Sequence, residues 1–143
     1  MTSVVFDASV AAKWCLPAAG EPLAEEALDL LKRYVSGELQ IVVPDLFWPE
    51  LGNILWKAVR QGRTSRGSAR EAISVMRDRG LPTIPSPDLI EDALAIALRF
   101  ERTVYDGVYV AAAIAQNTTL ITADERLANA LGGHLPVRWL GAV

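Results

Sequence analysis

The chain has 143 residues, the size of one domain, and 51% of them are hydrophobic, which is enough for a full buried core. Its net charge of −3 argues against a protein that coats nucleic acid over its whole surface. Cys15 is the single cysteine, which excludes an internal disulfide and suits a reducing compartment. The start lacks the pattern of a signal peptide, and the longest apolar run, near 109–115, is far short of the roughly 20 residues of a membrane helix. We therefore expect one cytoplasmic domain over residues 1–143, with no membrane segment.

Hydrophobic periodicity predicts strands that alternate with helices in the first half of the chain. The expected elements are a buried strand at 4–6, a short helix at 8–14, an amphipathic helix at 21–35, a second strand at 41–43 and a helix at 46–61. Asp45 is placed to cap the last of these helices, and Pro49 is tolerated because it lies near the first turn.

The same alternation continues to the end of the chain. We expect a helix from Thr64 or Ser65 to about 79, a short strand at 83–84, a helix at 88–101 introduced by Ser86-Pro87, an alanine-rich helix at 108–115, a strand at 120–122, a short helix at 124–130 and a last strand at 137–140. Strands alternating with crossover helices predict a three-layer α/β fold around a mainly parallel sheet.

Acidic residues follow two of the predicted strands, Asp7 after the first and Asp124 after the fourth. In open α/β folds the functional crevice lies at the carboxyl ends of the strands, where the strand order reverses. If these two strands are neighbours, their acids meet there, and we expect Glu50 and Asp106 to join them. For Asp106 and Asp124, a capping role at a helix start is the alternative.

Four gathered carboxylates require a counter-charge, because like charges raise one another's pKa. Carboxylate oxygens suit hard cations such as Mg²⁺ or Mn²⁺, and the chain offers no competing soft site. A bound divalent cation activates water and neutralises charge on a phosphodiester. The acids therefore favour metal-dependent phosphodiester hydrolysis.

Four stretches resemble the motifs of PIN-domain ribonucleases, the VapC toxins of type II toxin–antitoxin systems. They are residues 6–14 (FDASVAAKW), 44–55 (PDLFWPELGNIL), 105–113 (YDGVYVAAA) and 120–127 (LITADERL), and they cover nearly the whole chain in the order of the family. The last two motifs are the most specific. Gly107 stands where the family often has alanine, and Pro49 directly precedes Glu50.

The resemblance implies a PIN-like α/β/α fold with a five-stranded, mainly parallel sheet in the order 3-2-1-4-5. It implies an Mg²⁺- or Mn²⁺-dependent endoribonuclease toxin that cuts RNA, is neutralised by a cognate VapB-type antitoxin and forms a homodimer. Asp7, Asp106 and Asp124 would bind the metal, and Glu50 would bind it or position the attacking water. Ser9, Thr122 and Asn53 would orient these carboxylates, although a plain structural hydroxyl or amide is the alternative for each.

A basic block interrupts this acidic chain: Lys57, Arg60, Arg63, Arg66 and Arg70 follow one another with no acid between them. We expect Arg60, Arg63 and Arg66 to contact RNA phosphates through charge. A solvated surface or an antitoxin contact is the alternative.

Two rival functions fit parts of the sequence. A haloacid-dehalogenase-like phosphatase also begins with a strand that ends in Asp, but it needs a second Asp two residues later, where this chain has Ser9. A PIN-like module that binds RNA or a partner without cutting is the other alternative, and it gives no reason to keep four acids together.

Overall fold

The computed structural model of the chain describes residues 2–143 and contains one parallel sheet. The strands are β1 (Thr2–Phe6), β2 (Leu39–Pro44), β3 (Thr83–Ile84), β4 (Leu120–Thr122) and β5 (Val137–Trp139). Their order across the sheet is β3-β2-β1-β4-β5. The predicted α/β class and strand order are confirmed, and every pairing is parallel.

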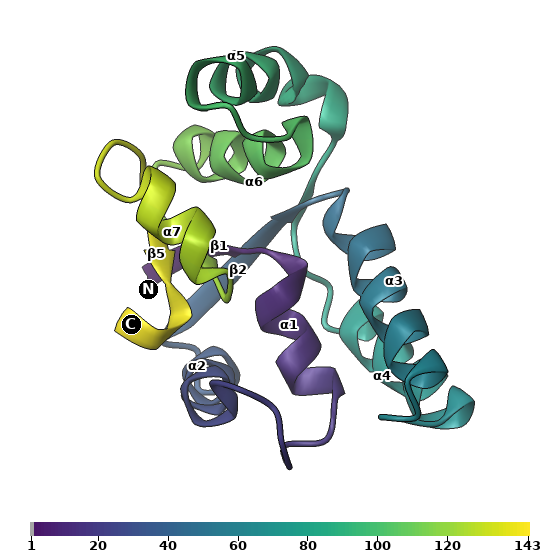
Figure 1. Cartoon of the computed structure of the whole chain (residues 1–143). Coiled ribbons are helices and arrows are strands. Elements are labelled where there is room, and N and C mark those ends of the chain that lie inside the picture. Colours follow the sequence, from purple (N-terminus) through teal and green to yellow (C-terminus); the bar gives the residue numbers. More distant parts are fainter. Residues whose placement is uncertain (1) are drawn as a thin grey trace.

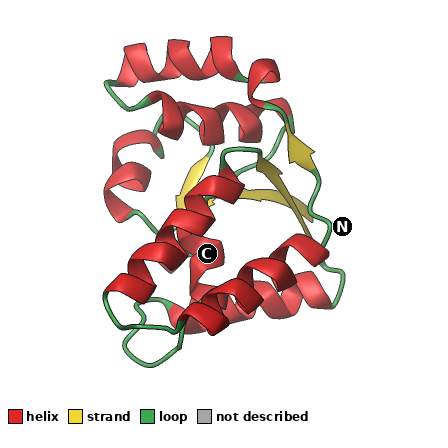
Figure 2. Cartoon of the chain, turned by 90° about the vertical axis from the view of Figure 1, so that its right-hand side faces the viewer, coloured by secondary structure: helices red, strands yellow, loops and turns green. Residues whose placement is uncertain are grey.

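Helices cover both faces of this sheet (Figures 1 and 2). They are α1 (Ala8–Cys15), α2 (Ala24–Val35), α3 (Phe47–Arg60), α4 (Arg66–Asp78), α5 (Ile90–Phe100), α6 (Val104–Ala115) and α7 (Glu125–Leu131), with 3₁₀ turns at Ser86–Asp88 and Leu140–Ala142. In Figure 1, α5 and α6 lie above the strands, α1 and α2 lie below them, and α3 and α4 run side by side at one edge. The layers are therefore α/β/α. No helix within residues 2–143 has the length and apolar character needed to cross a bilayer.

The first strand, β1, lies at the centre of the sheet and holds the core together. Val5 and Phe6 are almost fully buried, as expected for a parallel strand covered on both faces. β1 pairs with β2 on one side and with β4 on the other, with Phe6 opposite Ile121. The strand order therefore reverses beside β1, and the carboxyl ends of β1 and β4 lie at the same edge.

Gly107 allows α6 to lie against α5. A Cβ atom placed on Gly107 would overlap the carbonyl oxygen of Ala93, which belongs to the backbone of α5 and has little freedom to move. The glycine at this position is thus explained by a close helix–helix contact, and it brings the first turn of α6 over the end of the sheet.

Several predicted helix boundaries are wrong, and side-chain caps explain two of them. Asp45 does not cap α3; its carboxylate accepts hydrogen bonds from the backbone N–H and the hydroxyl of Ser86. Ser86 therefore opens a 3₁₀ turn, and α5 begins at Ile90 rather than at 88. Helix α6 begins at Val104 instead of 108, because the Thr103 side chain accepts the backbone N–H of Asp106 and closes the first turn earlier. The amphipathic helix α2 begins at Ala24 rather than at 21.

Candidate active site

Asp7 lies where β1 ends and α1 begins, and its side chain is buried, with the residue 8% exposed. One carboxylate oxygen accepts the backbone N–H of Ser9 at 3.1 Å and also the Ser9 hydroxyl. Burial raises the pKa of Asp7 to about 6; the charge of Glu50 adds to the rise, while hydrogen bonds from the chain, including the Ser9 and Thr122 side chains, oppose it. Asp7 is thus a buried acid beside a second acid, Glu50. A bound cation would offset their negative charges and stabilise the ionised form of Asp7.

Two hydroxyl groups connect Asp7 with the end of β4. Ser9 donates its hydroxyl hydrogen to Asp7 and accepts the backbone N–H of Ala123 at 3.1 Å. The side chain of Thr122 is completely buried, and its hydroxyl oxygen accepts the backbone N–H of Asp124 at 3.0 Å. Ser9 and Thr122 thus hold the turn after β4 against the start of α1.

Asp124 is exposed and caps α7, where it accepts the backbone N–H of Leu127 at 3.2 Å. Asp124 therefore caps α7, as one of its two predicted roles requires. One carboxylate oxygen takes part in this hydrogen bond, and a carboxylate has about four lone-pair sites, so capping leaves it free to bind a cation as well.

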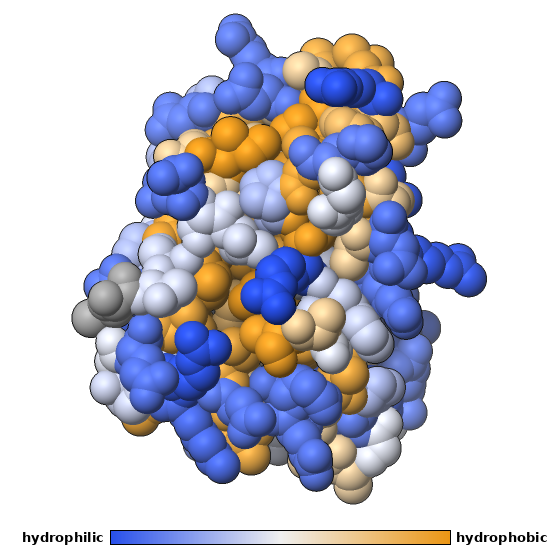
Figure 3. Space-filling view, turned by 90° about the vertical axis from the view of Figure 1, so that its left-hand side faces the viewer, coloured by the Kyte–Doolittle hydropathy of each residue, from blue (hydrophilic) through white to orange (hydrophobic). Residues whose placement is uncertain are grey.

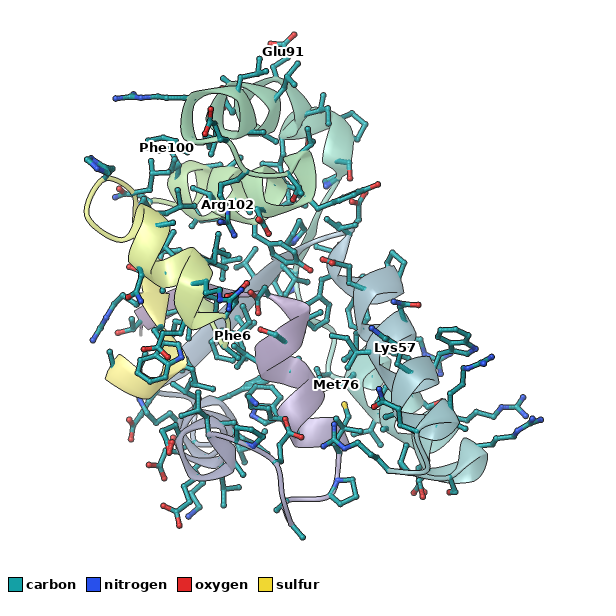
Figure 4. All side chains as sticks on the ribbon, in the orientation of Figure 1. Phe6, Lys57, Met76, Glu91, Phe100 and Arg102 are labelled. Atoms are coloured by element: carbon teal, nitrogen blue, oxygen red, sulfur yellow. The ribbon has the colours of Figure 1, made fainter. Side chains whose placement is uncertain are left out.

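Asp106 lies in the first turn of α6 and forms an ion pair with Arg102, with 3.3 Å between the Asp106 oxygen and the Arg102 Nε. Both side chains are partly buried. Figure 4 shows Arg102 beneath α6, on the side that faces α7 and α1. Asp106 does not cap its helix, because Thr103 has that role.

Glu50 lies in the first turn of α3 and is partly buried. Its charge reaches both Asp7 and the hydroxyl of Tyr109, since it raises the pKa of each group. Pro49 sits at the third position of α3 without disrupting it, as expected near a first turn. Asn53, one turn further along, is exposed.

Of the four predicted acids, the structure brings Asp7 and Glu50 near each other, since the charge of Glu50 raises the pKa of Asp7. Asp106 instead pairs with Arg102, and Asp124 caps α7. Among residues 2–143, no three His, Cys, Asp or Glu side chains lie close enough together to hold a metal ion. The residues nevertheless fit a hard cation, because Asp7 and Glu50 offer carboxylate oxygens and lie close enough together for the charge of Glu50 to raise the pKa of Asp7. Mg²⁺ keeps several waters and engages one or two carboxylates directly, so a full cage of protein ligands is not required.

Comparison with known proteins identifies the family of the chain. Residues 4–131 match the family model described as PIN domain. The chain belongs to the PIN-domain family. It is 32% identical over 127 residues to Ribonuclease VapC3 of Pyrobaculum aerophilum, covering 87% of this chain and 92% of the relative. The predicted resemblance to VapC ribonucleases is confirmed.

Solved structures show the same fold. The crystal structure of PAE2754 from Pyrobaculum aerophilum superposes with a TM-score of 0.68 at 20% identity, covering 99% of this chain and 92% of the other. A toxin–antitoxin complex from Klebsiella pneumoniae contains a chain that superposes with a TM-score of 0.59 at 20% identity, covering 94% and 95%.

The basic block of this PIN domain separates into two parts. Arg60 and Arg66 line a groove of about 620 Å³ between α3 and α4, together with Trp56, over whose ring the Arg60 guanidinium lies at 5.1 Å. Arg63 instead pairs with the nearly buried carboxylate of Glu21, which also binds Lys13 at 2.9 Å. Arg63 thus has a structural partner that the sequence did not indicate.

Sequence reasoning missed two residues at the acidic edge of the PIN domain. Arg102 precedes Asp106 by four residues, the spacing at which a helical or near-helical ion pair forms. Tyr109 follows Asp106 by three residues and therefore lies on the same side of α6. Both spacings are visible in the sequence. That they bring Arg102 and Tyr109 to the acids follows only from the position of α6 over the sheet.

Proposed function

We propose that this PIN domain is a metal-dependent endoribonuclease toxin that hydrolyses RNA phosphodiester bonds. The observation that carries the proposal is Asp7, a buried carboxylate with a raised pKa at the strand-order reversal, with Glu50 beside it. Ribonuclease VapC3, similar over most of both chains, supports the substrate class.

Asp7, Asp106 and Asp124 would hold the cation, and Glu50 would bind it or accept a hydrogen bond from the attacking water and orient it. The cation, Mg²⁺ or Mn²⁺, supplies a water of lowered pKa and neutralises charge on the phosphate. Ser9 and Thr122 keep Asp7 and the turn before Asp124 in place. Arg102 pairs with Asp106 in this structure and would be placed to contact a phosphate oxygen once Asp106 binds the cation.

Two protein partners are proposed, an antitoxin and a second copy of this chain. A cognate VapB-type antitoxin neutralises the toxin, in line with the toxin–antitoxin complex that shares the fold. Exposed apolar side chains recur every four residues along α5, at Ile90, Leu94 and Leu98, which are 45–73% exposed. Apolar side chains also gather over the level of α5 and α6 in Figure 3. This stripe supports a homodimer, and the reducing environment suited to Cys15 supports a cytoplasmic location.

Metal dependence gives the direct test. We expect the purified chain to cut a structured RNA in Mn²⁺ and to leave it whole in EDTA, with activity restored when Mn²⁺ is added back. Products separated on a denaturing gel measure this. A small aryl phosphate should remain unhydrolysed under the same conditions. RNA left whole in Mn²⁺ would favour a non-cleaving PIN module, and turnover of the aryl phosphate would favour a phosphatase.

The groove between α3 and α4 predicts where RNA binds. Replacing Arg60 and Arg66 with Glu reverses two exposed charges, and we expect the KM for RNA to rise about tenfold at physiological salt while kcat stays the same. The control is Arg77→Glu with Arg99→Glu, two exposed arginines on α4 and α5 outside the groove. If the two double variants have equal KM values, the groove does not bind RNA.

A further inference from the structure

Tyr109 carries a buried hydroxyl that the fold does not satisfy. The residue is 4% exposed, and its oxygen makes no hydrogen bond of good geometry, although the Glu50 carboxylate and the backbone of Ala8 lie close enough to shift its pKa. Within residues 2–143, two other buried side-chain atoms share this condition, Glu26 Oε2 on α2 and Arg79 Nε after α4. Only Tyr109 of these three lies among the acids. Buried polar groups are nearly always paired, so an exception beside a catalytic cluster calls for a functional explanation.

The surroundings of this hydroxyl define what it can do. Burial raises the pKa of Tyr109 far above its usual value; the Glu50 carboxylate raises it as a hydrogen-bond acceptor and as a charge, Asp7 raises it further, and the backbone of Ala8 lowers it. A tyrosine hydroxyl has one hydrogen to donate, and Glu50 is the acceptor that lies close to it. The position of this hydroxyl, on α6 above the start of α1 and beside the first turn of α3, places it among the elements that carry Asp106, Asp7 and Glu50.

We propose that Tyr109 is a positioning residue of the RNA-cleaving site, and that its hydroxyl donates a hydrogen bond to the Glu50 carboxylate when Glu50 turns toward Asp7 to hold the cation or its water. The inference rests on the function proposed above. In the cation-free protein the hydroxyl has no hydrogen bond of good geometry, which lowers stability; in the loaded site it would fix the orientation of Glu50. The hydroxyl thus lowers the stability of the cation-free protein and, in return, orients Glu50 in the loaded site.

Tyr109→Phe removes the hydroxyl and keeps the ring. In EDTA we expect the Tm of the variant to rise by about 3 °C, because the unpaired buried donor is gone. In Mn²⁺ we expect kcat to fall about tenfold with the KM for RNA unchanged, since Glu50 loses its fixed orientation while RNA contacts remain. The Kd for Mn²⁺, measured by calorimetry without RNA, should rise about fivefold.

Tyr34→Phe is the matched control. The Tyr34 hydroxyl donates to the Arg79 carbonyl at 3.4 Å, away from the acids. Its removal should lower the Tm or leave it unchanged, and should leave kcat and the Mn²⁺ Kd at the wild-type values.

The result that would overturn the inference is a Tyr109→Phe variant with wild-type kcat and wild-type Mn²⁺ affinity, or one with a lowered Tm in EDTA, which would make the hydroxyl structural. Failure of the proposed function looks different: the wild type itself would not cut RNA in Mn²⁺. The Tm and Mn²⁺ measurements on Tyr109→Phe remain decisive in that case, because neither depends on cleavage.

Discussion

Asp106→Asn and Asp7→Asn will each reduce RNA cleavage in Mn²⁺ by about 1,000-fold or more. An amide keeps the shape of the side chain, and at Asp7 it still accepts the hydrogen bonds from Ser9. The loss is of charge: a cation site worth several kcal/mol of transition-state stabilisation loses a ligand, and each 1.4 kcal/mol is tenfold in rate. Single-turnover cleavage of labelled RNA measures the effect.

Asp92→Asn is the control for this pair, because Asp92 is an exposed acid in the first turn of α5, away from the sheet edge. It should cut RNA at the wild-type rate. Circular dichroism should show all three variants folded. If Asp106→Asn and Asp7→Asn both cut at the rate of Asp92→Asn, the reaction belongs to other residues.

Asp7→Asn will also make the cation-free protein more stable at neutral pH. Burial raises the pKa of Asp7 from 3.8 to about 6, so between these pH values the folded state holds a proton that the unfolded state has lost. The free energy of unfolding therefore falls as pH rises from about 4 to 6, by at most about 3 kcal/mol, and stays low above pH 6. The neutral amide avoids this cost.

Urea unfolding in EDTA between pH 4 and pH 8 measures the effect. The wild type should lose stability over the lower part of this range, and Asp7→Asn should lose less and exceed the wild type at pH 7.5 by up to about 3 kcal/mol. Added Mn²⁺ should stabilise the wild type at pH 7.5 and have little effect on the variant. If Asp7→Asn is less stable than the wild type at pH 7.5, burial of the ionised Asp7 carboxylate does not lower the stability of the fold.

Element types were predictable because their hydrophobic periods are local. The run at 4–6 is apolar throughout, and the run at 120–122 is a short β-type segment of Leu, Ile and Thr; both form buried strands of the parallel sheet. Helix starts were less predictable, since Asp45 and Thr103 have side chains that suit several capping roles. Ser86 is 41 residues from Asp45, so no local pattern shows that the two will bind each other.

The alternation of strands and helices, and the positions of Asp7 and Asp124 directly after strands, follow from residues that are neighbours in the chain and could be predicted. The pairing of Arg63 with Glu21, the pairing of Arg102 with Asp106 and the position of the Tyr109 hydroxyl beside Glu50 become visible only in the folded molecule. These contacts depend on the distances between helices. Close packing of the core sets those distances, as where Gly107 lets α6 lie against Ala93 of α5. Hydrogen bonds and ion pairs form over a few ångströms, so they follow from the packed arrangement of the layers and not from the hydrophobic pattern of any one segment.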